Sequence, residues 1–308
     1  MIGKDLTAIE RLDPADVLRI LDLADEVKAH PERYRTALGG KTLGMLFQKP
    51  STRTRVSFEV GIYQLGGMGL FLSGAELQLG RGETIPDTAR VLSRFVDAIM
   101  ARVFAHSDIE ALAENATVPV INGLSDFSHP CQALADYQTM REHSGHLDGL
   151  TLAYVGDANN VYNSLLVCGM KLGVNVAIAA PRGYQPDPAL VERYRGHAAR
   201  KGLRALVTDD PFEAVREADF VYTDVWTSMG QEKEKQARLE ALAPYQVNSK
   251  LMAAAKPGAK FMHCLPAHRG EEVTDEVADS RASIIFDEAE NRLHAQKAVM
   301  LILMGQKA

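Results

Sequence analysis

The stretch TLGMLFQKPSTRTRVSFEVG, residues 42–61, decides the fold of the first half of the chain. Its first six residues are mostly apolar and predict a buried strand, and from Val56 onward apolar residues recur at helical spacing. The segment QKPSTRT between them therefore spans a strand-to-helix turn, where Ser51 has the position of a helix N-cap. A strand joined to a helix by a short turn is the repeating unit of an α/β fold.

The same alternation of apolar runs and helical patterns continues along the chain and occurs in two series. This pattern predicts an α/β protein with two domains, each a mainly parallel sheet flanked by helices, and 308 residues is a length typical of about two domains. The predicted strands are residues 42–47, 69–73, 98–103 and 118–123 in the first series, and residues 151–157, 175–181, 219–226 and 259–266 in the second.

The boundary between the two series lies after QALADYQTMREHSG, a helical pattern that stops at Gly145 and is followed by the polar connection HLDGL. We therefore predict a first domain of residues 1–145 and a second domain of residues 146–287. The remaining residues, 288–308, form a long helix whose C-terminal part is apolar on most sides, so it should be buried.

Composition excludes several classes of function. A formal net charge of −6 and a pI near 5.9 argue against nucleic acids and acidic membranes as general partners, because both require a basic face. The first twenty residues lack the apolar core of a signal peptide, and no run reaches membrane-spanning length. The three cysteines, an odd number, do not suggest a disulfide framework. We expect a cytoplasmic, reduced protein.

The turn at residues 48–54 gathers groups that bind anions. Backbone N–H groups, hydroxyl donors and the positive end of the helix dipole converge there, and the Arg53 guanidinium suits bidentate contact with phosphate oxygens. The simpler alternative is an N-capped surface helix with solvated arginines. Because the run is denser in donors than capping requires, we favour a phosphate site formed by Ser51, Thr52, Arg53 and Thr54. The spacing of a Walker loop is absent.

A second group of donors belongs to the same predicted sheet. Arg102 ends one strand, and His129 and Gln132 lie where the chain enters a helix after another strand. The carboxyl ends of parallel strands open on one edge, so these residues can face one pocket. A neutral histidine, an amide and an arginine are suitable donors for a carbonyl oxygen that gains negative charge during acyl transfer.

The strand ends of the second half have different chemistry, because carboxylates and amides suit an ammonium group or an amino acid. A dinucleotide site is disfavoured, since G-x-G-x-x-G is absent from VGDANNV. Cys264 has four possible roles: a nucleophile, a zinc ligand with His263 and His268, a substrate contact or a small buried residue. The residues expected at this edge are Asp157, Asn160, Asp224, Ser228 and Cys264.

Together these segments resemble the aspartate/ornithine carbamoyltransferase family. STRTR and HPCQALAD are similar to motifs of the whole family, whereas DVWTSMGQE and HCLPAHRGEEV resemble its ornithine branch. The resemblance runs from about Leu6 to the final helix. It implies a carbamoyl-phosphate domain and an ornithine domain linked by two helices, with the C-terminal helix returning to the first domain.

The resemblance also implies roles for individual residues. Arg102, His129 and Cys264 would be catalytic, and Cys264 with Leu265 would bridge the two substrates. GDANN lacks an extra residue found in some relatives, which leaves a choice between Asn159 and Asn160, and we choose Asn160. The implied carbamoyl-phosphate contacts are Ser51, Thr52, Arg53, Thr54, Gln78, Arg102, His129, Gln132, Cys264, Leu265 and Arg292, and the implied ornithine contacts are Asn160, Asp224, Ser228 and Met229.

The implied reaction is attack of the δ-amine of L-ornithine on carbamoyl phosphate, giving L-citrulline and phosphate without a metal or an organic cofactor. Flux toward arginine biosynthesis and flux toward citrulline breakdown use the same site. The resemblance implies a homotrimer or an assembly of trimers, in which Gln78 completes a neighbouring active site. Two alternatives stay open: a sister carbamoyltransferase acting on putrescine or an acetylated ornithine, and an inactive paralogue that senses carbamoyl phosphate.

Overall fold

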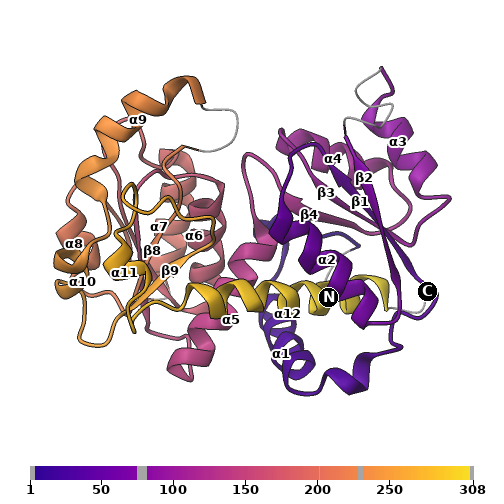
Figure 1. Ribbon diagram of the computed structural model, residues 1–308, viewed down its shortest axis with the longest axis horizontal. Helices are drawn as coiled ribbons and strands as arrows, with labels where there is room; N and C mark the ends of the chain where they lie inside the picture. Colours follow the sequence, from indigo (N-terminus) through magenta and orange to yellow (C-terminus); the bar gives the residue numbers. More distant parts are fainter. Residues whose placement is uncertain (1–3, 75–81, 201, 228–231, 306–308) are drawn as a thin grey trace. The chain divides into compact units, whose positions relative to one another are not determined.

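The computed structural model describes residues 4–74, 82–200, 202–227 and 232–305. The chain divides into two compact units, one containing residues 1–138 and 290–308 and the other residues 139–289. It passes between them within two helices, α5 (Pro130–Ser144) and α12 (Ile285–Met304). Each unit contains a parallel sheet with helices around it, so the predicted α/β class is confirmed (Figure 1). The C-terminal part of α12 belongs to the first unit.

In its described residues the first unit has a four-stranded sheet of order β2-β1-β3-β4, and every neighbouring pair is parallel. In this sheet Phe47 pairs with Ser73 on one side and with Arg102 on the other. Three strands therefore end at one level, and the turns that follow them start from the same edge. The elements are α1 (Pro14–Ala29), β1 (Thr42–Phe47), α2 (Thr52–Gln64), β2 (Met68–Ser73), α3 (Ile85–Leu92), β3 (Ala98–Arg102), α4 (His106–Asn115) and β4 (Val120–Leu124).

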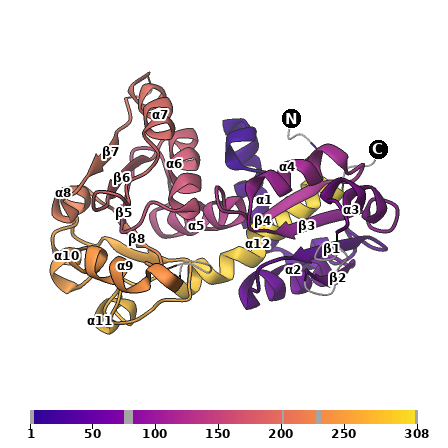
Figure 2. The ribbon, with the colours of Figure 1, turned by 90° about the horizontal axis from the view of Figure 1, so that it is seen from above.

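Both faces of this sheet are covered over β1, β3 and β4, as expected for parallel strands, whereas Met68 and Leu70 of the edge strand β2 are exposed. Helices α3 and α4 pack on one face (Figure 2). There Ile109 and Leu112 of α4 join a buried cluster with Leu46. Helix α2 lies on the other face and contacts α12, since a Cβ on Gly61 would come within 3.0 Å of the Met300 side chain. Gly61 thus permits the close approach of the two helices.

The second unit has, among described residues, a five-stranded parallel sheet of order β7-β6-β5-β8-β9. Thr223 at the end of β8 pairs with His263 at the end of β9, so their following turns start side by side. Its elements are β5 (Thr151–Val155), α6 (Asn160–Leu172), β6 (Asn175–Ala179), α7 (Pro188–Arg200), β7 (Ala205–Thr208), α8 (Pro211–Val215), β8 (Phe220–Thr223), α9 (Lys235–Leu242), α10 (Ser249–Ala253), β9 (Lys260–His263) and α11 (Asp275–Ala278).

The faces of the second sheet are also covered. On one face, Val155 and Phe261 join a cluster with Val215 of α8 and Leu251 of α10. On the other, Tyr154 packs edge-on against Tyr162 of α6, with ring centroids 5.5 Å apart. Strand β7 was not predicted, because its four residues are only partly buried and their apolar pattern is weak. In the part of the chain with a described position, no helix is sufficiently long and apolar to cross a bilayer.

Candidate active site

The turn after β1 forms a capped helix start, as predicted. Ser51 has extended backbone dihedrals, and its Oγ accepts a hydrogen bond from the Thr54 N–H at 3.3 Å. The same Oγ donates to Thr54 Oγ1 at 3.1 Å, while Thr54 itself is buried. Thr52 is exposed and Arg53 half-buried, so both are accessible at the first turn of α2. This end of the helix therefore presents hydroxyl and guanidinium donors together with the positive end of the dipole.

Hydrogen bonds connect the turn after β1 with the end of β3 and the residues that follow it. The Gln48 N–H donates to the Arg102 carbonyl at 2.9 Å, and the Gln48 side chain accepts from the Phe104 N–H and donates to Asp108. Lys49 lies 4.6 Å from the Phe104 ring centroid. Burial lowers the Lys49 pKa, and the nearby Arg102 charge lowers it further. The position of Lys49 near Arg102 and Phe104 was not predicted, although Lys49 lies in the segment that carries the motif.

Three nitrogen-rich side chains come together beyond β3 and β4: Arg102, His129 and Arg292. All three are buried. Burial is the main cause of a His129 pKa well below its ordinary value, and the positive charges of Arg292 and Arg102 add to the effect. The imidazole is therefore neutral at neutral pH, so one ring nitrogen can donate a hydrogen bond without carrying charge. A neutral donor near two guanidinium groups is suited to an oxygen that becomes anionic.

Gln132 and Arg292 are joined directly. Arg292 Nη1 donates to Gln132 Oε1, and Gln132 Nε2 donates to Asp136 Oδ1 at 2.7 Å. In the amide orientation that satisfies its neighbours, Gln296 accepts from Arg292 and donates to Ser57 Oγ at 2.7 Å. Arg292, which only the family resemblance suggested, thus lies with Gln132 in the first unit. Gln296 was missed, because an amide on a buried helix face gives no distinct sequence signal.

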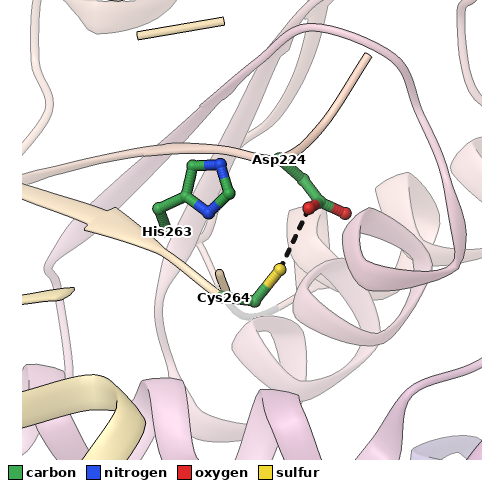
Figure 3. A group of neighbouring side chains, drawn as sticks. All are labelled: Asp224, His263 and Cys264. Carbon is green, nitrogen blue, oxygen red and sulfur yellow. Dashed lines mark hydrogen bonds between the residues drawn. The ribbon is translucent and has the colours of Figure 1, made fainter. Parts of the chain in front are cut away.

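The second unit has an acidic and amide cluster at the ends of β5, β8 and β9. Asp224 Oδ1 accepts a hydrogen bond from the Cys264 thiol at 3.0 Å (Figure 3). It also accepts one from the Val225 N–H at 2.8 Å. Asp224 Oδ2 accepts from Asn159 Nδ2 at 2.6 Å. Asp224 is buried, and Cys264 is only partly buried. The expectation that Asp224 and Cys264 lie at one edge is confirmed, and Cys264 is not a fully buried core residue.

Asn159 and Asn160 have different environments. The Asn159 side chain is the N-cap of α6, accepting from the Val161 and Tyr162 N–H groups at 2.9 and 3.3 Å, and its amide nitrogen is bound to Asp224. Asn160 is the first residue of α6 and is partly exposed. The Asn159 side chain therefore has a structural role, and the assignment of Asn160 as the ligand contact stays a prediction.

The turn around Cys264 is held by buried ionisable groups. Leu265 has a positive φ of 59°, an unfavourable value for a branched side chain. Its N–H donates to His263 Nδ1 at 2.8 Å, so this nitrogen carries no proton and the proton lies on Nε2, which faces Glu272 Oε1 at 3.1 Å. Buried Glu288 accepts from the His263 N–H at 2.9 Å. Both ring nitrogens of His263 are thus engaged within the protein and not directed at a metal held with Cys264.

Asp157 does not join the Asp224 cluster through a described hydrogen bond; it pairs with Arg238. Arg238 is buried, donates to Asp157 and to the Trp226 carbonyl, and lies over the Tyr184 ring. Burial raises the Asp157 pKa, and the Arg238 charge opposes that shift. Gln78, Ser228 and Met229 lie outside the described residues.

Comparison with known proteins supports the resemblance in both units. The model of the aspartate/ornithine carbamoyltransferase carbamoyl-P binding domain matches residues 4–142, and that of the Asp/Orn binding domain matches residues 148–303. The chain belongs to the aspartate/ornithine carbamoyltransferase family. Within this family the chain is 58% identical to the ornithine carbamoyltransferase of Thermococcus kodakarensis over 307 residues, 99% of this chain and 98% of that protein.

Two further comparisons come from Pyrococcus furiosus. Its anabolic ornithine carbamoyltransferase is 55% identical over 307 residues, which cover 99% of this chain and 98% of the relative. A solved structure of ornithine carbamoyltransferase from the same organism superposes with a TM-score of 0.95, 55% identity and coverage of 99% of this chain and 98% of that one. The similarity thus extends over both units and not only over the short motifs.

Proposed function

We propose that this protein transfers the carbamoyl group of carbamoyl phosphate to the δ-amine of L-ornithine, giving L-citrulline and phosphate. The observation that carries the proposal is the neutral, buried His129 near Arg102 and Arg292 in a chain 58% identical to an ornithine carbamoyltransferase. We assign the phosphate to the start of α2 and the carbamoyl oxygen to Arg102 and His129. The Thermococcus and Pyrococcus relatives, one of them named anabolic, support a role in arginine biosynthesis.

The neutral δ-amine attacks the carbamoyl carbon, and the carbonyl oxygen becomes an oxyanion in a tetrahedral intermediate. Arg102 and His129 donate hydrogen bonds to that oxygen, a type of contact that stabilises the transition state more than the bound substrate. The C–O bond to phosphate then breaks, and the proton lost by the attacking nitrogen leaves with the phosphate. Arg53 and the N-terminus of α2 stabilise the charge that collects on the departing phosphate.

Ornithine is assigned to the cluster at the strand ends of the second unit. Asp224 supplies a carboxylate for an ammonium group, and Asn160 supplies an amide for the amino-acid end. Ser228 and Met229 join this proposal on the family resemblance alone. Steady-state phosphate release with ornithine, putrescine and N-acetylornithine tests it. We expect turnover with ornithine to exceed the others, whereas preference for another amine, or no phosphate release with any, would reject the assignment.

Cys264 is proposed to contact substrate and not to form a covalent intermediate. Its thiol donates to Asp224, an arrangement that keeps the proton on sulfur. Intact-mass spectrometry of the wild type with carbamoyl phosphate alone checks this directly. A mass increase of one carbamoyl group on Cys264 would contradict direct attack by the amine.

A homotrimer is proposed for the assembly, and the cytoplasm for its location; the three cysteines are free, as suits a reducing compartment. The first unit carries exposed apolar side chains on α2 and the neighbouring strand β2, which suits contact between copies. These exposed apolar residues are Val56, Val60, Tyr63, Met68 and Leu70.

Light scattering should give the mass of a trimer or a multiple of it. Mixing Gln78→Ala with Arg102→Ala should restore some activity in hybrid trimers if Gln78 serves a neighbouring site.

A further inference from the structure

Among the described residues, two groups bring three metal-binding side chains within reach of one ion. The first, Asp224 with His263 and Cys264, belongs to the candidate active site (Figure 3). Its histidine accepts a backbone hydrogen bond through Nδ1 and faces Glu272 through Nε2, so both nitrogens are already engaged. The second group is His268, Glu271 and Glu272, on the segment that follows the Cys264 turn. The proposed reaction does not use this second group.

The geometry of the second group fits a single cation. His268 Nδ1 is 3.7 Å from Glu271 Oε2 and 4.0 Å from Glu272 Oε2, and the three ligand atoms lie within 4.8 Å of one another. Ligands about 2.0–2.2 Å from an ion are separated from each other by roughly 3 to 4 Å. Only a small movement of the three side chains would therefore place an ion at bonding distance from all of them.

Burial supplies a second, independent observation. The Glu272 side chain is 0% exposed, and its Oε1 accepts from His263 Nε2 and from the His268 N–H. Among the described residues its Oε2 is buried without a hydrogen-bond partner and points into the group, as does the buried Oε2 of Glu271. A buried carboxylate oxygen without a donor is energetically costly, and two such oxygens facing each other also repel. The Lys235 ammonium group lies 3.3 Å from the other oxygen of Glu271, Oε1.

We propose that His268, Glu271 and Glu272 bind one divalent cation of the zinc type. One imidazole nitrogen and two carboxylate oxygens are ligands that Zn²⁺ accepts, and water can take the remaining position. His263 holds the second oxygen of Glu272, as outer hydrogen bonds commonly orient a metal-binding carboxylate. The His268 side chain is 44% exposed, which gives the ion a path from solvent.

The competing explanation is that His268 contacts the two glutamates only as a direct side-chain pair. The group would then bind no metal with useful affinity. Direct titration separates these explanations, because only a metal site gives a saturable binding signal that depends on all three side chains.

The experiment titrates Zn²⁺ into the metal-free, full-length protein by calorimetry and compares four variants with the wild type. His268→Ala and Glu271→Gln remove ligands, whereas Cys264→Ser disables the first group. His30→Ala is the matched control, because His30 is an exposed histidine 3.8 Å from a single exposed glutamate, Glu32. Thermal melts in EDTA verify that every variant is folded.

We expect wild type, Cys264→Ser and His30→Ala to bind Zn²⁺ at this site, and both ligand variants to bind it more than about tenfold more weakly, since losing even an outer partner costs about 10–100-fold. Saturating Zn²⁺ should raise the melting temperature of the wild type but not that of His268→Ala. Undiminished affinity in His268→Ala, loss of all binding in Cys264→Ser, or no binding by the wild type would overturn the proposal.

Discussion

The strand ends of the two units have the same architecture and opposite chemistry. In the first unit, Arg102 is the last residue of β3, and the turns after β1 and β4 lead to Arg53 and His129. These side chains present cationic and neutral donors. In the second unit, the turns after β8 and β9 present Asp224 and Cys264, an acceptor and a thiol. The sheets are parallel in both, so the loop residues and not the fold set the charge of each edge.

This difference suggests a division of labour. A doubly charged phosphate and a carbonyl oxygen that becomes anionic both require donors, whereas an amine requires acceptors. Residues of the first edge should therefore control carbamoyl phosphate and the chemical step, and residues of the second edge should control ornithine. The division would be wrong if a substitution at the first edge mainly weakened the use of ornithine, or one at the second edge mainly weakened the binding of carbamoyl phosphate.

The largest effect is expected for Arg102→Ala. Removing a donor to the developing oxyanion typically lowers kcat about 10²- to 10³-fold, so turnover should fall by that factor with both substrates saturating. Arg90→Ala is the matched control, because Arg90 is an exposed arginine of the same unit that pairs with Asp87. Phosphate-release assays measure both variants. Turnover of Arg102→Ala close to that of the control would remove Arg102 from the mechanism.

Asp224→Asn should affect the other substrate. Losing a charged hydrogen-bond acceptor costs about 1.5–3 kcal/mol, equivalent to roughly 10- to 150-fold in kcat/KM for ornithine, with carbamoyl-phosphate affinity unchanged. Asp219 precedes the same strand, β8, and binds the Thr151 N–H and Lys256 instead of the site. Asp219→Asn should therefore lower stability without raising KM for ornithine. Equal increases of KM in both variants would count against a specific role for Asp224.

The third prediction concerns pH and the neutral state of His129. Its folded-state pKa lies below the ordinary value near 6.5, so only the unfolded chain gains this proton as the pH falls below about 6.5. The stability associated with His129 is therefore fully present above that pH and is lost below it, by up to about 1.4 kcal/mol per pH unit. Urea unfolding between pH 5 and 8 should show a smaller slope for His129→Gln than for wild type. The exposed control His30→Gln should keep the wild-type slope; equal slopes in all three proteins would contradict a buried neutral imidazole.

The smallest effect is expected for removal of the side-chain cap of α2, and it tests whether this cap also serves phosphate binding. Ser51→Ala and Asn248→Ala each remove a side-chain N-cap, one in each unit, and each should cost about 1 kcal/mol of stability. Only Ser51→Ala should also weaken carbamoyl-phosphate binding, because only that helix start is assigned to phosphate. Unfolding midpoints and ligand titrations on the same samples make the test. A cap variant at Asn248 that weakens carbamoyl-phosphate binding equally would show that general destabilisation explains the loss.

The sequence was sufficient to predict the fold class and the strand-to-helix turns, because apolar periodicity and capping are local signals. Ser51 as a cap and Arg102 at a strand end follow from such signals and are confirmed. Strand ends were less accurate: the predicted strand 219–226 stops at Thr223, since Asp224 accepts from the next N–H and turns the chain.

Long-range pairs were not predictable from one sequence. Arg238 and Asp157 are 81 positions apart, and Arg292 and Gln132 are 160 apart, so no local pattern links them. The contact between Glu272 and His263 was not predictable either, although both belong to the motif HCLPAHRGEEV. Nothing in that motif shows that the Glu272 carboxylate is buried against His263. Tertiary packing alone decides which of the many polar loop residues converge.

The most direct test of the division of labour is titration of carbamoyl phosphate into wild type, Arg53→Ala and Cys264→Ala in the absence of ornithine. The account predicts that Arg53→Ala binds carbamoyl phosphate about 10- to 150-fold more weakly, the equivalent of roughly 1.5–3 kcal/mol, while Cys264→Ala binds it as the wild type does. Equal loss of carbamoyl-phosphate affinity in the two variants would contradict the separation of a phosphate edge in the first unit from an amine edge in the second.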